Sequence, residues 1–183
     1  MQDISKGIEG MNVGVQVVQH EPVRWHAHAT VRKYWGDVSE DMLQSAQPPQ
    51  PYETVEADGN LLLTAGITLL LNLLIGAGGT TYANANCYLG VGDSSAAEAI
   101  GQTDLQAATN KLRKAVAATY PQVATNVLTV QAVFATGDAN WVWNEWGTFN
   151  ASTAGTMLNR KVASLGTKTS AASWTLTITI TIS

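Results

Sequence analysis

The sequence predicts a mainly β protein, a sandwich or jelly roll, with one buried apolar helix and an extended N-terminal arm. Two observations carry this fold class. Several short segments alternate apolar and polar residues, and Gly-rich turns separate them. One uncharged, Leu-rich run also interrupts the series of strands. Many short strands with one helix are typical of sandwiches and jelly rolls.

The N-terminal part predicts an arm. Residues 13–20 and 22–35 have the pattern of two extended segments around Pro22, and the second alternates apolar with polar residues. Residues 44–59 contain a Pro cluster without periodicity, which is typical of a linker. We therefore expect an arm or attachment segment over residues 1–54 and a β-rich structural domain over residues 55–183.

The Leu-rich run predicts a buried helix near residues 61–76. It carries no charge from Leu61 to Ala77, which is shorter than the roughly 20 residues that a membrane-spanning helix needs. Its flanks also lack the basic residues common beside membrane spans. A helix that is apolar nearly all round belongs in a core, so no membrane span is expected.

The rest of the chain predicts strands over residues 86–95, 126–136, 140–149, 156–165 and 174–183. The second and third are expected to pair through the turn between them. Leu105, Ala108, Leu112 and Val116 follow helical spacing, but the run KAVAATYP at residues 114–121 fits an extended segment equally well. In the last strand one face is wholly apolar, formed by Trp174, Leu176, Ile178, Ile180 and Ile182. An uncharged edge of this kind would template aggregation, so we expect partners on both sides, with a second subunit as one source.

Charge is scarce in this chain. Charged residues make up 13% of it, against about 25% in a typical domain. A surface so poor in charge predicts that further copies cover it, in a homo-oligomer for which a trimer is one option. The net charge is −4 and the basic residues are scattered, so direct nucleic-acid binding is not expected. Cys87 is the sole cysteine, which predicts a buried, inert thiol.

No pattern in the sequence predicts catalysis or a cofactor. Phosphate-loop and nucleophile-elbow motifs are absent, and Asp93, Glu98 and Asp104 fit turn or capping roles. His26 and His28 alternate on one strand face, so three copies around a threefold axis would bring imidazoles together around one metal ion. Two histidines on a solvated surface is the simpler interpretation, and no metal site is predicted.

Residues 140–149 hold two further candidates. Trp141, Trp143 and Trp146 are core or subunit-interface residues in the favoured interpretation, and a sugar-stacking platform in the alternative. Glu145 interrupts the apolar pattern, and a buried lone carboxylate is very costly. Arg160, in the next predicted strand, is the natural partner, so Glu145 and Arg160 are predicted to form a structural ion pair.

Several motifs together resemble small virion proteins of tailed bacteriophages, often labelled tail or tail-fibre proteins. The similarity covers about residues 59–183 and rests on GNLLLTAGI, YLGVGDSS, QTDLQ, VFATGDANWVWNEWGTFN, GTMLNRK and the Thr/Ile-rich last strand. It brings no enzymatic residues with it.

The resemblance implies a non-enzymatic structural component of the virion, made in the host cytoplasm and bound to other phage virion proteins. Its expected place is the tail, baseplate or fibre attachment. A capsid decoration or head-fibre protein is the first alternative, and a receptor- or glycan-binding module is the second.

Overall fold

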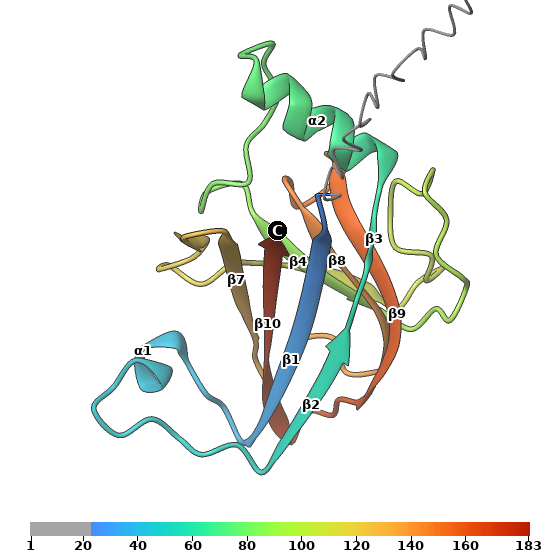
Figure 1. Ribbon diagram of the computed structural model, residues 1–183. Coiled ribbons are helices and arrows are strands. Elements are labelled where there is room, and N and C mark those ends of the chain that lie inside the picture. Colours follow the sequence, from blue (N-terminus) through green and yellow to red (C-terminus); the bar gives the residue numbers. More distant parts are fainter. Residues whose placement is uncertain (1–22) are drawn as a thin grey trace, which may run out of the picture.

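The computed structural model describes residues 23–183, which form two antiparallel five-stranded sheets packed face to face (Figure 1). The first sheet runs in the order β2 (Glu53–Asp58), β1 (Trp25–Trp35), β10 (Ala172–Ile182), β7 (Val127–Phe134) and β6 (Gln122–Ala124). The second runs in the order β3 (Leu61–Leu62), β9 (Met157–Thr167), β8 (Val142–Phe149), β4 (Tyr88–Gly92) and β5 (Lys111–Ala115). Two helices are added, α1 (Glu40–Leu43) and α2 (Thr64–Leu74). The predicted mainly β class is confirmed.

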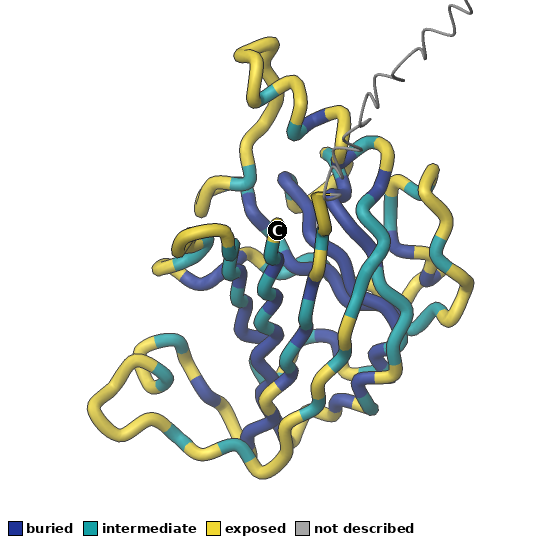
Figure 2. The backbone as a smooth tube through the Cα atoms, viewed as in Figure 1, coloured by how far each residue is buried: buried dark blue, intermediate teal, exposed yellow. Residues whose placement is uncertain are grey.

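The core lies between the two sheets, where alternate residues of each strand meet (Figure 2). Ala27, Ala29 and Val31 of β1 point inward, and Leu176 and Ile178 of β10 lie beside them. Residues on the other face of these strands are polar, as the period of two in a strand requires.

Strand β10 is the central strand of the first sheet. It pairs with β1 from Trp25↔Ile182 to Trp35↔Ala172, and with β7 from Trp174↔Phe134 to Thr181↔Val127. The prediction that this strand has partners on both sides is confirmed. Both partners belong to the same chain, so no second subunit is needed to cover its edges.

The predicted division into an arm over 1–54 and a body from 55 does not describe residues 25–54. Strand β1 pairs along its whole length with β10, and its inward residues belong to the main core. The Pro-rich segment is the loop that brings the chain back as β2 beside β1, rather than a linker. The sequence could not show this, because β1 and β10 lie more than a hundred residues apart. The extended segment predicted at 13–20 lies outside the described residues.

The pairing predicted between residues 126–136 and 140–149 is wrong. Strand β7 belongs to the first sheet and β8 to the second, so the turn between them crosses the sandwich. Asp138 holds that turn, since its carboxylate accepts hydrogen bonds from the Ala135 amide at 2.9 Å and the Lys114 ammonium at 2.6 Å. Residues 105–116, with their helical spacing, form no helix: β5 covers Lys111–Ala115, and loops precede and follow it.

The predicted apolar helix exists as α2, but it is not buried. Within it only Gly66 and Leu69 are buried, and its outer face is exposed (Figure 2). Gly66 packs against the backbone of Leu158 in β9 so closely that a Cβ atom would collide with it. The helix therefore rests on the end of the second sheet through its first turns. Among the described residues, no helix is long and apolar enough to cross a membrane.

Candidate functional site: a buried ion pair and an exposed apolar helix

The predicted pair between Glu145 and Arg160 is present in the second sheet. The Arg160 Nε atom donates to Glu145 Oε2 at 2.7 Å, and both side chains are completely buried. The same carboxylate accepts hydrogen bonds from the backbone amides of Gln106 at 2.9 Å and Ala107 at 2.7 Å. Glu145 thus has three donors, which is the condition under which a charge can be buried.

Arg160 uses its remaining donors on the loop between β4 and β5. Its guanidinium donates to Gln102 Oε1 at 3.0 Å and to the Ala96 carbonyl at 2.9 Å. Nearby, Glu98 accepts the Val162 amide at 2.7 Å. These contacts fasten the loop over residues 93–110 onto the sheet. The pair therefore has a structural role, and its carboxylate offers no surface to a substrate.

The other carboxylates singled out in the sequence also have structural partners. Asp104 accepts hydrogen bonds from Lys111 at 2.7 Å and from Arg113 at 2.8 Å. Burial opposes its ionisation, but these hydrogen bonds outweigh burial and lower the pKa of Asp104. Asp93 accepts a hydrogen bond from Asn110 at 2.8 Å. Glu98 accepts the Val162 amide and so helps to hold the loop over residues 93–110 against the sheet.

The tryptophan cluster does not provide a ligand platform. Trp143 and Trp146 are completely buried, and Trp143 packs edge-on against Trp174 and Phe134 with ring centroids 4.8 and 4.7 Å apart. Trp141 is partly buried against the same core. The sugar-stacking alternative is wrong for Trp143 and Trp146, because a ligand cannot reach faces that the core already covers.

The two histidines face the neighbouring edge strand β2. His28 Nδ1 lies 2.6 Å from Asp58 Oδ1, and His26 Nε2 lies 3.7 Å from the same oxygen. The hydrogen bond with His28 is the main cause that lowers the pKa of Asp58. No group of three or more His, Cys, Asp or Glu side chains in residues 23–183 is arranged to hold a metal ion. Cys87 is buried, and that burial raises the pKa of its thiol to about 12.

The exposed side of α2 is the feature most in need of a partner. Ile67, Leu71 and Leu74 of α2, with Ile75 at its C-cap, recur at the spacing of one helix face. Leu71 is 56% exposed, Leu74 80% and Ile75 77%. We call these four residues the α2 stripe. The chain carries no charged residue between Asp58 and Asp93, so no charge interrupts the surface around the stripe.

An apolar hollow lies beside α2 at the same end of the sandwich. Its volume is about 280 Å³, and its lining comes from α2, both sheets and the β6–β7 turn; the lining includes Trp25, Leu70, Tyr82, Leu128, Leu158 and Ile180. Two more hydrophobic residues that line it are themselves exposed, Val123 at 73% and Ile182 at 47%. Stripe and hollow share helix α2, so we treat them together as the apolar end of the molecule.

Sequence reasoning located α2 but missed its exposure. Apolar content shows that a helix must be covered, and it does not show whether the same chain covers it. The low overall charge is the one feature of the sequence from which a covered surface is expected. No family model, curated protein or solved structure matches the chain significantly.

Proposed function

We propose that this chain is a non-enzymatic structural component of a tailed bacteriophage virion, which assembles as a homo-oligomer in the tail, baseplate or fibre-attachment region. The observation that carries the proposal is the exposed α2 stripe on a chain with only 13% charged residues. The sequence resemblance over residues 59–183 supplies the phage context. A particle subunit has to bury such a surface against its neighbours.

Burial of the α2 stripe alone would not offset the free-energy cost of association. Burying one Leu or Ile side chain fully contributes about 1.5–3 kcal/mol. The four residues are already partly covered, so roughly 4–8 kcal/mol remains to be gained on the same scale. Association costs about 4–15 kcal/mol in lost rigid-body freedom. The apolar hollow, with Val123 and Ile182, therefore has to join the interface for a stable assembly.

A second copy of the chain fits the stripe better than a charged partner does. Complementary charges select one partner over another. The segment from residue 59 to residue 92 has no charged residue with which to make such a selection. A neutral apolar helix face is complementary to itself across a symmetry axis, as closed homo-oligomers require. Packing of α2 against α2 would cover the face that no other described segment of the chain covers.

One pair of variants tests self-association through this surface. Leu71→Glu places a charge on the stripe, and Asn72→Glu places the same charge one residue away on an exposed position. We expect the wild-type chain and Asn72→Glu to sediment as oligomers and Leu71→Glu to sediment as a folded monomer. Leu71 is exposed in the single chain, so its replacement changes folding stability by no more than about 0.5 kcal/mol.

A monomeric wild-type chain at concentrations up to the millimolar range would contradict the proposal. Equal oligomer formation by Leu71→Glu and the wild type would show that another surface makes the contact. The capsid-decoration alternative is distinguished by copy number, since decoration proteins occupy a particle in hundreds of copies and tail parts in a few to a few dozen.

A further inference from the structure

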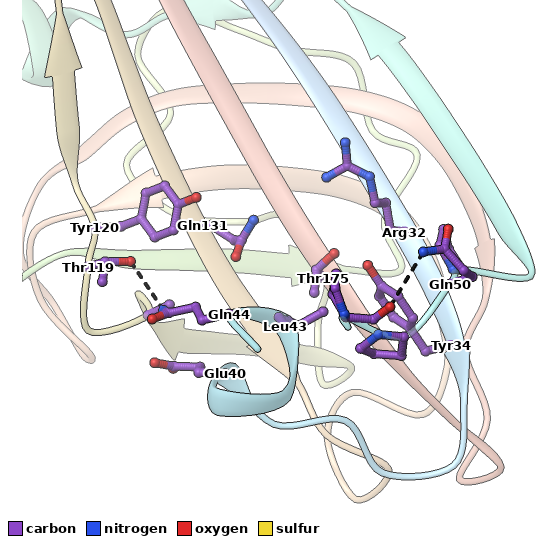
Figure 3. A pocket seen from close by; sticks show the side chains of 14 residues that line it. Arg32, Tyr34, Glu40, Leu43, Gln44, Gln50, Thr119, Tyr120, Gln131 and Thr175 are labelled. Carbon is purple, nitrogen blue, oxygen red and sulfur yellow. Dashed lines mark hydrogen bonds between the residues drawn. The ribbon is translucent and has the colours of Figure 1, made fainter. Parts of the chain in front are cut away.

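A polar groove lies on the outer face of the first sheet, away from the apolar end. Its floor is formed by β1, β10 and β7, and its walls are the β1–β2 loop with α1 on one side and the turn at residues 117–120 on the other (Figure 3). The groove has a volume of about 300 Å³. That volume is at the lower end of the range of about 300–1,000 Å³ for ligand pockets, which suits a ligand of one or two rings.

Half of the residues that line the groove have side chains that both donate and accept hydrogen bonds, and five others, mostly prolines, are apolar. The donating and accepting groups are amides and hydroxyls contributed by the sheet, the loop and the turn: Tyr34, Gln44, Gln50, Thr119, Tyr120, Gln131 and Thr175. One guanidinium, Arg32, and one carboxylate, Glu40, complete the polar lining. The charged groups therefore balance, and the groove has no excess charge that would select an anion or a cation.

Two of the sheet residues present polar groups that the protein itself does not satisfy. Thr175 is 2% exposed, and its hydroxyl has no hydrogen-bond partner among the described residues. Tyr34 is 5% exposed as a residue and lines the same floor; its hydroxyl is not one of the buried unpaired atoms, so solvent reaches it from the groove (Figure 3). Arg32 lies directly opposite Thr175 in the β1–β10 pairing. Buried polar groups are nearly always paired. The Thr175 hydroxyl is the one unpaired buried atom among the described residues that line the groove, so a hydrogen-bond partner could be added there.

The walls of the groove are held in place without a ligand. Glu40 accepts the Ala118 amide at 2.9 Å, which ties α1 to the opposite turn. The Asn84 amide donates to the carbonyls of Ala117 at 3.0 Å and Tyr120 at 2.6 Å, which fixes that turn from behind. A site formed in advance loses little free energy in ordering itself when a ligand binds.

We infer that this groove binds a neutral sugar ring, such as one residue of a glycan. Sugar hydroxyls both donate and accept hydrogen bonds, and amide and hydroxyl side chains are the groups that match them on both counts. Phosphate would require more than one cation here, and the single Arg32 is balanced by Glu40. The inference does not depend on self-association, because all the lining residues come from one chain.

The test is a titration of the isolated protein with D-glucose, D-galactose, D-mannose and N-acetyl-D-glucosamine, each up to 50 mM, followed by amide NMR shifts. We expect saturable shifts for at least one sugar, centred on residues around the groove. Tyr34→Phe and Thr175→Val each remove one hydroxyl and keep nearly the same side-chain volume. Each should weaken that binding by about fivefold or more. Thr181→Val is the matched control, since it removes a hydroxyl from the same face of β10 outside the groove, and it should bind as the wild type does.

Folding failure is separated from loss of binding by the melting temperature. Thr175→Val deletes an unpaired buried hydroxyl and should melt no lower than the wild type. The inference is overturned if none of the four sugars gives saturable shifts. It is equally overturned if both Tyr34→Phe and Thr175→Val bind as well as Thr181→Val does.

Discussion

At the scale of single residues, the described structure depends on a few charges placed where water cannot reach. Glu145 and Arg160 lie in an otherwise apolar sheet, and each is satisfied by the other and by the loop over residues 93–110. The sequence predicted the pair because one carboxylate and one guanidinium interrupted neighbouring strands. It could not predict the loop contacts, because they join Gln102 and Ala96 to a strand about 60 residues further along the chain.

Removing one member of this pair should destabilise the fold strongly. Glu145→Ala leaves the Arg160 charge buried without its partner, and such a loss costs about 3–5 kcal/mol. Urea unfolding should show this decrease in the free energy of unfolding, while Glu56→Ala, an exposed control, should stay within about 0.5 kcal/mol of wild type. The double variant Glu145→Ala with Arg160→Met should recover part of the loss. An unfolding curve for Glu145→Ala that overlays the wild type would disprove the structural role.

Asp104 predicts a pH dependence of stability in the acid range. Its pKa is lowered in the folded chain, so its ionised form contributes stability above the unfolded pKa of about 3.9. That contribution is lost as the pH falls through the folded value. Asp104→Asn should therefore be less stable than wild type at pH 6, and the difference should shrink toward pH 2. A difference that stays constant over this range would mean that the ionisation of Asp104 makes no contribution.

At the scale of secondary-structure elements, the alternation of apolar and polar residues predicts where strands lie, but it does not predict which strands pair. The strands at β7, β8, β9 and β10 were identified from period-two patterns, because one face of each contacts the core. Their neighbours could not be read from the same patterns, since turn sequences do not show whether a chain folds back into the same sheet or crosses to the other. Strand β1 was assigned to an arm for this reason, although it pairs with β10 along its length.

Truncation of β10 tests whether this strand organises the first sheet. Deleting Thr177–Ser183 removes more than half of the β10 pairs with β1 and with β7, together with the core residues Ile178 and Ile180. We expect the truncated chain to lose cooperative unfolding and to fail to assemble. Deletion of Ser183 alone removes only its two backbone hydrogen bonds with Arg24 and no core residue, so it should keep cooperative unfolding. A folded, soluble product of the longer deletion with the native oligomeric size would show that the strand is dispensable.

At the scale of the whole molecule, two surfaces stand out and neither could be predicted in full. The Leu-rich run predicts an apolar helix. Its exposure depends on the tertiary structure, because the two sheets form the main core without any buried residue of α2. The polar groove brings together residues from β1, β7, β10 and the β1–β2 loop, which are far apart in the chain (Figure 3). One surface is suited to a neighbouring copy and the other to a small polar ligand, so a particle subunit would have room for both roles.

The most direct test of the central claim is quantitative mass spectrometry of purified particles made by the genome that encodes this chain. The structural proposal predicts that the chain copurifies with intact particles through a density gradient, at a fixed ratio of a few to a few dozen copies for each particle. The chain should also remain bound after washing at high salt, because an apolar contact does not weaken as salt screens charge. If the chain is abundant in the infected cell and missing from washed particles, it is not a virion component and the proposed function is wrong.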